Sequence, residues 1–251
     1  DVNGVLYFMA NDGVNGNELW KSDGTDAGTV MVKNIGVGAA GISTESMTNV
    51  NGVLYFTINQ FDLWKSDGTA AGTVKVKGFG TIQNLVNVNG TLFFAATDDV
   101  YANANAYGFE LWKSDGTLAG TTMIKDINPG PTGSGMQELL AVGGTLYFSA
   151  LNTATGRELW KSDGTESGTT LIQDRNLGNV FFSPKKLTLC GNKLFMTGST
   201  ATEGLELFVY DINTLKIKEN NLADNFKIFP NPSNGNFNIE VTENLIDSKA
   251  T

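Results

Sequence analysis

The sequence predicts an all-β fold, a β-propeller of four-stranded antiparallel blades. Three observations support this prediction: a motif repeats at the spacing of one blade, a two-residue turn recurs at a fixed place in each repeat, and 30 of the 251 residues are Gly. Aromatic residues make up 10% of the chain. Aromatic and β-branched residues favour strands, whereas Gly and Asn favour the tight turns between them. A chain of this length can also bury a sizeable core.

The motif "ELWKSDGT" occurs in four near-identical copies, which begin at Glu18, Asp62, Glu110 and Glu158. The tryptophans of these copies are spaced by 44, 48 and 48 residues. A fixed period in this range is the signature of a repeat architecture. A fifth copy, "LELFVYD", carries Phe208 in place of the tryptophan. The chain is therefore predicted to contain five structural units.

Each complete unit is predicted to form four strands, clearest in the fourth unit as "ELLAV", "TLYFSA", "RELWKS" and "TTLIQD". A two-residue turn joins the first two strands, Asn-Gly in three units and Gly-Gly or Gly-Asn in the others. These residues are typical of a type I′ turn, in which both central residues have a positive φ. Strands such as "LYF" and "ELW" are apolar on both faces, as expected for blades packed between two neighbours. A β-solenoid of hairpins is the alternative architecture.

The repeats divide the chain into predicted units at residues 1–43, 44–80, 81–133, 134–180 and 181–220. The first unit lacks its opening strand and Asp1 begins in the middle of the pattern, so we expect the natural protein to continue upstream. Residues 221–251 form a separate segment, in which "FKIF" and "NFNIEV" are predicted to pair as a hairpin.

Composition excludes several classes of function. The net charge of −9 argues against binding to nucleic acid or to an anionic membrane, because both need a cationic surface. The chain has no His, which removes His general bases and His metal ligands. Cys190 is the only Cys, so no intrachain disulfide can form, and its apolar run predicts a buried side chain. No apolar run approaches the roughly 20 residues of a membrane span.

The "SDGT" turns raise the question of a calcium site, because each copy carries one carboxylate. Calcium needs about six to eight oxygen ligands, usually with several carboxylates. Because only one carboxylate recurs, we expect each Asp to cap its own turn, and no cofactor is predicted. Calcium remains the alternative, at Asp23, Asp67, Asp115 and Asp163. The repeated Trp is expected in the core between blades, with a sugar-stacking platform as the alternative.

Catalysis is not expected from the repeated acidic residues of the motif. Five equivalent carboxylates occupy five equivalent environments, whereas acid–base catalysis needs two carboxyl groups in different environments. With no His in the chain, this pattern predicts a non-enzymatic protein with no catalytic residues. The five acidic residues are Glu18, Asp62, Glu110, Glu158 and Glu206.

Blade topology indicates where a ligand would bind. In a four-stranded antiparallel blade, the first–second and third–fourth turns lie on one rim, and the other connections lie on the opposite rim. The "SDGT" turns share the first rim, and the connections of variable length, such as Thr97–Phe109, share the second, which we call the irregular rim. Binding sites are usually built from variable loops on a rigid scaffold. The predicted ligand-binding residues on the irregular rim are Asp98, Asp99, Tyr101, Tyr107, Phe181 and Phe182.

Two stretches resemble known families. The unit "ELWKSDGTxxGT", with "NGxLYF" upstream, resembles the ELWxxDGT (hyalin-like) repeats of large secreted bacterial proteins and covers residues 1–220. The resemblance implies a propeller-like array. The stretch "IFPNPSNGNFNIEV" resembles the start of the type A C-terminal sorting domain of the type IX secretion system, a small β-sandwich that is longer than the segment present here. The residues that match this sorting signal are Phe229, Pro230, Asn231, Pro232 and Gly235.

The sorting-domain resemblance implies export across the outer membrane of a Bacteroidota-type bacterium, with the translocon and its outer-membrane shuttle as partners. The sequence therefore predicts an extracellular or cell-surface module for binding, adhesion or surface structure, with a glycan or protein ligand. The alternative is a secreted hydrolase whose catalytic residues lie in irregular loops or in an N-terminal part outside this chain. A passive spacer is the third hypothesis.

Overall fold

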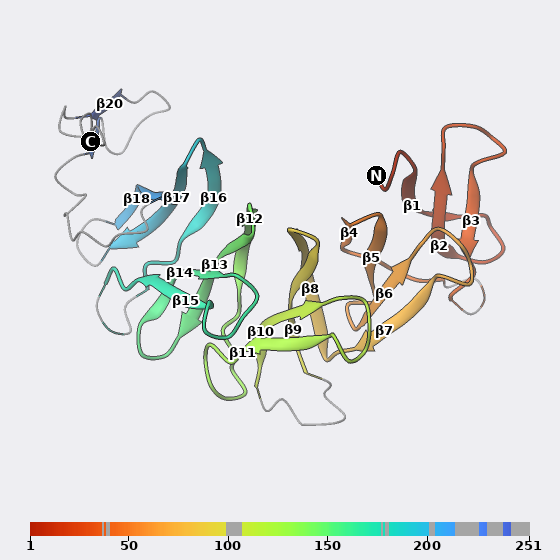
Figure 1. The fold of residues 1–251 in the computed structure, drawn as a ribbon, viewed down its shortest axis with the longest axis horizontal. Coiled ribbons are helices and arrows are strands. Elements are labelled where there is room, and N and C mark those ends of the chain that lie inside the picture. Colours follow the sequence, from red (N-terminus) through yellow and green to blue (C-terminus); the bar gives the residue numbers. More distant parts are fainter. Residues whose placement is uncertain are drawn as a thin grey trace, which may run out of the picture. The chain divides into compact units, whose positions relative to one another are not determined.

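The computed structural model describes residues 1–36, 38, 41–98, 107–176, 178, 181–200, 204–213, 226–229 and 238–241. The fold of these residues is built from β-strands, and they contain no α-helix. The chain separates into two units, Asp1–Tyr210 and Asp211–Thr251. The first unit is a series of five antiparallel sheets, each formed by strands that are consecutive in the chain (Figure 1). The all-β prediction is confirmed.

Three of the sheets have four strands, as predicted for a blade. The second sheet contains β4 (Met47–Val50), β5 (Val53–Ile58), β6 (Asp62–Ser66) and β7 (Val74–Gly78). The third sheet contains β8 (Thr81–Val88), β9 (Thr91–Thr97), β10 (Phe109–Ser114) and β11 (Thr122–Lys125). The fourth sheet contains β12 (Gln137–Val142), β13 (Thr145–Asn152), β14 (Gly156–Ser162) and β15 (Thr170–Gln173).

The first and fifth sheets have three described strands each, and the first lacks its opening strand, as predicted. The first sheet contains β1 (Leu6–Asn11), β2 (Asn17–Ser22) and β3 (Val30–Lys33). The fifth sheet contains β16 (Lys185–Cys190), β17 (Lys193–Thr200) and β18 (Gly204–Asp211). Each of the five sheets lies within one predicted unit. The C-terminal hairpin is also present, with β19 (Phe226–Phe229) antiparallel to β20 (Asn238–Val241).

The turns between the first two strands of each unit fall into two groups. In the first three sheets both central residues have a positive φ, as at Asn51 (52°) and Gly52 (82°), which confirms the type I′ prediction. In the fourth and fifth sheets only the first central residue does, Gly143 (58°) and Gly191 (60°). The type I′ prediction is wrong for those two turns. A positive φ at the first central residue alone is the pattern of a type II′ turn, for which Gly is the favoured residue.

Register shifts recur at equivalent positions of the sheets. Wherever the third strand of a unit pairs with the fourth, the register shifts between the Leu and the Trp of the motif, as between Leu111 and Trp112. A second bulge in β8 lies between Gln83 and Val86 and includes Asn84, whose φ is 58°. Bulges increase the local twist of a strand.

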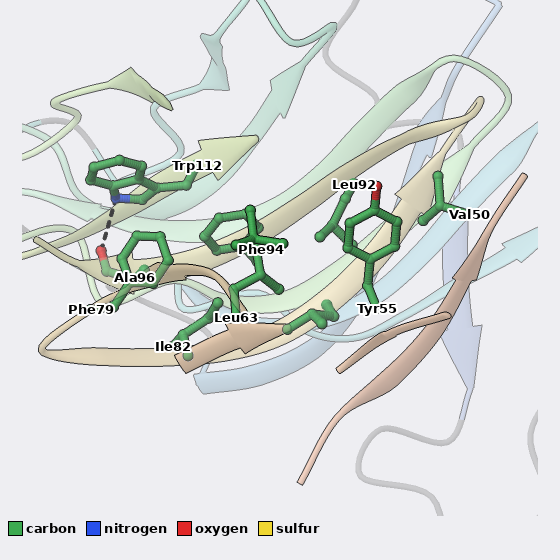
Figure 2. Packing of buried hydrophobic residues seen from close by; sticks show 11 residues of the cluster. Val50, Tyr55, Leu63, Phe79, Ile82, Leu92, Phe94, Ala96 and Trp112 are labelled. Atoms are coloured by element: carbon green, nitrogen blue, oxygen red, sulfur yellow. Dashed lines mark hydrogen bonds between the residues drawn. The ribbon is translucent and has the colours of Figure 1, made fainter. Parts of the chain in front are cut away.

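The apolar core lies between consecutive sheets. Tyr55 and Leu63 of the second sheet pack with Leu92, Phe94 and Trp112 of the third (Figure 2). Equivalent clusters join the first sheet to the second and the third to the fourth. In each cluster the Leu of "ELW" faces the next sheet, and the Leu of "NGxLYF" faces the preceding one. Both faces of an internal sheet are therefore buried, as the apolar strands predicted.

The repeated tryptophans belong to this core. Trp112 and Trp160 are buried, and Trp64 is half-buried against the cluster between the first two sheets. The indole Nε1 of Trp112 donates a hydrogen bond of 3.1 Å to the carbonyl oxygen of Ala96 on the neighbouring strand (Figure 2). The core prediction is confirmed for Trp112 and Trp160.

The expectation that the side chain of Cys190 is buried is wrong, because this side chain is exposed. It ends β16, and the equivalent residues of the second and third sheets are Val50 and Val88. Both valines are buried, and each contributes to the cluster that its sheet forms with the next one. The fifth sheet has no following sheet among the described residues, so Cys190 remains exposed.

Candidate functional site on the irregular rim

Each "SDGT" turn is closed by its own side chains. The Oδ1 atom of Asp115 accepts hydrogen bonds from the backbone N–H and the hydroxyl of Thr117, both 2.8 Å long. The hydroxyl oxygen of Ser114 accepts the N–H of Gly116 at 3.0 Å. The other three turns repeat this pattern. The predicted capping role of the Asp is therefore confirmed, and the bonds from Thr117 lower the pKa of Asp115.

The second Gly of "SDGTxxGT" is required for steric reasons. A Cβ atom on Gly120 would overlap the carboxylate of Asp115, and the same relation holds in the other three turns. Within the described ranges, no group of three or more His, Cys, Asp or Glu side chains could hold a metal ion. The motif thus uses its carboxylate to close the turn.

The motif also joins each sheet to the next. The Nζ atom of Lys113 in the third sheet donates a hydrogen bond of 2.7 Å to the carbonyl oxygen of Gly164 in the turn of the fourth. Lys21 of the first sheet makes the equivalent 2.8 Å bond to Gly68 of the second. The residue that follows the Leu of "NGxLYF" also contacts this turn. The ring of Phe93 lies so close to Gly164 that a Cβ atom on Gly164 would be 2.9 Å from it. We call these two contacts of one sheet with the "SDGT" turn of the next, made by the lysine and by the aromatic residue, the inter-sheet joint.

On the opposite rim, the Glu of "ELW" binds the connection to the next sheet. Glu110 is fully buried, and its carboxylate accepts hydrogen bonds from Ile127 N (3.1 Å), Asn128 N (3.2 Å) and Ser134 Oγ (2.8 Å). Glu18 and Glu158 accept backbone N–H groups of their own connections in the same way. These carboxylates hold the irregular rim in place.

The environment of the buried carboxylates alters their acidity. Burial raises the pKa of Glu110 to about 7, although the hydrogen bonds from Ser134 and the backbone oppose the change. Burial also raises the pKa of Glu158 to about 7. In the second unit Asp62 replaces the Glu and instead forms an ion pair with Lys75 at 2.7 Å.

The structure places the predicted ligand residues in different environments. The side chains of Tyr107 and Phe181 are exposed on the irregular rim. Asp98 is half-buried, and its carbonyl oxygen accepts the N–H of Gly80 at 3.2 Å. Asp99 and Tyr101 lie outside the described residues.

Phe182 does not belong to this exposed set. Its side chain is 1% exposed, and its ring packs edge-to-face on Phe208 with the centroids 4.7 Å apart. The guanidinium of Arg175 lies 5.5 Å from the centre of the same ring. The expectation that Phe182 contacts a ligand is therefore corrected: it is a core residue beneath the connection, and Phe181 is the exposed one.

Two further exposed apolar residues were not predicted. Val14 lies between β1 and β2, and Phe61 lies between β5 and β6, both on the irregular rim. With Tyr107 and Phe181, four connections of this rim each present one exposed large apolar side chain. The four "SDGT" turns carry a single such residue in the described structure, Leu118. The signal in the sequence for Phe61 was the aromatic residue of the short loop "INQF", which directly precedes the motif, as Phe109 does in the third unit.

The sorting signal falls almost entirely outside the described residues. Phe229 ends β19, and Pro230, Asn231, Pro232 and Gly235 are not described. In the part of the chain that the structure describes, no helix is long and apolar enough to cross a membrane.

Comparisons with known proteins show similarity in fold only. No family model matches the chain, and no curated protein matches it. A puromycin hydrolase S511A mutant complexed with PGG aligns with a TM-score of 0.52 and 14% identity, over 90% of this chain and 39% of that chain. A puromycin-hydrolyzing peptidase from Mycobacterium tuberculosis aligns with a TM-score of 0.50 and 14% identity, over 85% and 36%. The chain thus spans about two fifths of these structures, and the class they support is a β-propeller-like all-β fold.

These matches overturn the expectation that the chain is not an enzyme. A similar fold occurs in proteins that are hydrolases or peptidases by name, so the fold of this chain gives no ground for excluding catalysis. At 14% identity the likeness concerns the fold, and no reaction is carried over to this chain.

Proposed function

We propose that the chain is a secreted or cell-surface β-propeller module that binds a glycan or protein ligand through its irregular rim. The observation that carries the proposal is the set of exposed apolar side chains on that rim. Exposed apolar groups on loops of a rigid scaffold are typical of interaction sites. The four residues are Val14, Phe61, Tyr107 and Phe181.

The anchoring of the rim supports this assignment. Beside the exposed Phe181, the backbone N–H of Phe182 donates to the buried carboxylate of Glu158 at 3.2 Å, and the ring of Phe182 is buried against Phe208. A connection fixed in this way loses little conformational entropy when it binds a ligand. Aromatic side chains suit either the apolar face of a sugar or an apolar protein surface. The net charge of −9 favours a neutral or cationic ligand.

Alanine variants of the irregular rim test this proposal. A glycan array and a cell-surface pull-down with the whole chain identify the ligand, and Phe61→Ala, Tyr107→Ala and Phe181→Ala are then titrated against it. We expect each variant to weaken binding about tenfold, and Leu118→Ala on the opposite rim to leave it unchanged. Equal losses for Leu118→Ala and the aromatic variants would contradict the assignment of the site.

Export by the type IX secretion system is part of the same proposal. Its support is the resemblance of the stretch around Phe229 to a type A sorting domain, together with a hairpin, β19–β20, at the start of that segment. Replacing Pro230 and Pro232 by Ala in a host with this system is expected to retain the protein inside the cell. Secretion at the original level would contradict the proposed route.

A secreted hydrolase is the second candidate. The observation that favours it is the carboxyl group of Asp126, whose Oδ1 atom is buried without a hydrogen-bond partner. Burial also raises the pKa of Asp126. A broad glycosidase and peptidase screen tests it. Turnover that is lost in Asp126→Asn and kept in Asp26→Asn would favour the hydrolase over a binding-only role.

A further inference from the structure

Ser134 lies in the connection between the third and fourth sheets (residues 126–136) and faces two oxygen atoms. Its Oγ atom is 2.8 Å from Oε2 of Glu110 and 3.0 Å from the carbonyl oxygen of Phe109. The side chains of Ser134 and Glu110 are fully buried. A serine hydroxyl group carries a single hydrogen. If Glu110 is ionised, one of the two contacts therefore has no hydrogen between its oxygens, which is costly in a buried position.

We propose that, at and below neutral pH, Oε2 of Glu110 carries a proton in the native protein and that this proton fastens the connection to the third sheet. The protonated Oε2 donates to Ser134 Oγ, which reverses the direction of that bond, and the Ser134 hydroxyl donates to the carbonyl oxygen of Phe109. Each contact then contains one hydrogen. We call these two bonds the proton-dependent anchor.

Deprotonation should weaken this anchor in two ways. It removes one of the two hydrogens, and it leaves a charge on a side chain that is fully buried. The backbone N–H groups of Ile127 and Asn128 still donate to the ionised carboxylate of Glu110, at 3.1 and 3.2 Å. The connection should therefore become looser above neutral pH without being released.

The surroundings of Glu110 favour its protonated form. Burial is the largest cause that raises the pKa of Glu110 to about 7; the bonds from Ser134 and the backbone oppose the change, and the charge of Asp126 on the connection adds to it. On the neighbouring strand β9, the uncharged Ala96 lies opposite Glu110. From the fourth sheet, Arg157 Nη1 donates at 2.8 Å to the carbonyl oxygen of Gly135. In the described part of the chain, no lysine or arginine forms an ion pair with Glu110.

The equivalent carboxyl group of the fourth sheet lacks this anchor. Glu158 accepts the backbone N–H groups of Arg175 (3.4 Å) and Phe182 (3.2 Å), but it accepts no hydroxyl group from the described residues. Burial raises the pKa of Glu158, whereas the positive charge of Arg175 lowers it. The proton-dependent anchor is therefore specific to the third sheet.

The connection supports a part of the irregular rim. A Cβ atom on Gly108 would lie 2.3 Å from the backbone nitrogen of Gly133, so the connection packs directly on the residue that follows Tyr107. A looser connection should therefore weaken a ligand contact made by Tyr107. This step rests on the proposed function, and it predicts that affinity at the rim falls as the pH rises through about 7.

Infrared spectroscopy of the whole chain locates the proton directly. The difference spectrum between the parent protein and Glu110→Gln should contain a carboxylic-acid C=O band at about pH 6, and this band should be replaced by carboxylate bands at about pH 9. Because Glu158 is present in both proteins, its signal cancels. A difference spectrum with only carboxylate bands at about pH 6 would overturn the proposal.

Amide hydrogen exchange measures the loosening. After correction for intrinsic base catalysis, protection of the Ile127 and Asn128 amides should fall about tenfold between about pH 6 and pH 8.5 in the parent protein. In Glu110→Gln, which cannot ionise, protection should not change with pH. Ser134→Ala should lower protection at both pH values, whereas Ser149→Ala, which removes another buried hydroxyl group that has no partner, should not. Protection in the parent protein that is independent of pH would overturn the proposal.

The link to the rim has a separate readout. Affinity for the ligand identified by the glycan array or pull-down should fall with rising pH in the parent protein and stay constant in Glu110→Gln. Constant affinity in both proteins, together with pH-dependent exchange, would overturn the link to Tyr107. The infrared and exchange measurements need no ligand, so they test the anchor even if the proposed binding function is wrong.

Discussion

Lys113 and Gly164 lie 51 residues apart in the chain, and the Nζ atom of Lys113 donates a hydrogen bond of 2.7 Å to the Gly164 carbonyl oxygen. The bond connects the third sheet to the turn of the fourth. It gives the repeated lysine of "ELWKSDGT" a role that is neither catalytic nor ligand-binding. The motif both closes its own turn and receives the side chains of the preceding sheet.

The bond from Lys113 should contribute measurably to stability. Lys113→Met keeps most of the apolar stem but removes the donor, leaving the Gly164 carbonyl oxygen without this partner. We expect a loss of about 1–2 kcal/mol in the free energy of unfolding, measured by denaturant titration. Lys185→Met, which alters an exposed lysine at the start of β16, should change it by less than about 0.5 kcal/mol.

The inter-sheet joint can also be tested through its glycines. Gly116 and Gly24 have nearly the same positive φ, 84° and 91°, but a Cβ on Gly116 would overlap the hydroxyl of Tyr55, whereas one on Gly24 meets nothing within 4 Å. Both alanine variants should lose about 1 kcal/mol from the left-handed backbone. Gly116→Ala should lose about 1–3 kcal/mol more, because Tyr55 must move. Equal unfolding midpoints for the two variants would contradict the assigned contact between Tyr55 and the turn at Gly116.

Stability should rise as the pH falls from about 8 to 5. The folded-state pKa of Glu110 and Glu158 is about 7, above the ordinary value of 4.5, so the native protein binds more protons between these values. The stabilisation is complete below about 4.5 and is lost as the pH rises through 7. Each carboxyl group can contribute a slope of at most about 1.4 kcal/mol per pH unit. Calorimetry across this range measures the slope.

Below about pH 4 the direction should reverse. The pKa values of the four turn aspartates, such as Asp115, lie below the ordinary 3.8 because the following Thr donates two hydrogen bonds to each carboxylate. Their contribution is present above 3.8 and is lost as they protonate. Glu110→Gln with Glu158→Gln should flatten only the neutral limb of the profile, and Asp115→Asn only the acidic limb. A profile unchanged by Glu110→Gln would refute the assignment of the neutral limb.

Alanine substitution of the neighbouring residues Phe182 and Phe181 should reduce stability by very different amounts. Phe182→Ala removes a buried ring packed on Phe208 and should cost about 3–5 kcal/mol in the free energy of unfolding. Phe181→Ala removes an exposed ring and should change stability by less than about 0.5 kcal/mol. Thermal unfolding of the two variants checks the difference, and comparable losses would contradict the division into core and rim.

The repeated features of the fold could be predicted from the sequence. Asn-Gly pairs require a specific turn, strands such as "LYF" are apolar on both faces, and the Trp spacing sets the unit length, so local chemistry determined the sheets. The capping role of Asp115 followed in the same way, because an Asx turn involves only nearby residues.

Long-range contacts could not be predicted in this way. The bonds of Lys113 to Gly164 and of Glu110 to Asn128 depend on how one element lies against another. Phe181 and Phe182 are adjacent and chemically identical, so only the course of the connection decides which ring is buried. Cys190 was misplaced for a related reason: its alternating pattern predicts a buried face, but burial depends on a following sheet that the described structure does not contain.

The position of the apolar clusters between sheets affects how the compact unit Asp1–Tyr210 should respond to mechanical force. The second and third sheets each contribute side chains to two of these clusters, so the removal of either would expose both, whereas the first sheet contributes to one cluster. When a chain of nearest-neighbour contacts is stretched, it yields where the fewest contacts must break together. Under tension the sheets that share the fewest clusters should therefore detach before the second and third sheets do. A chain built in this way should extend in steps under load while its second and third sheets remain folded.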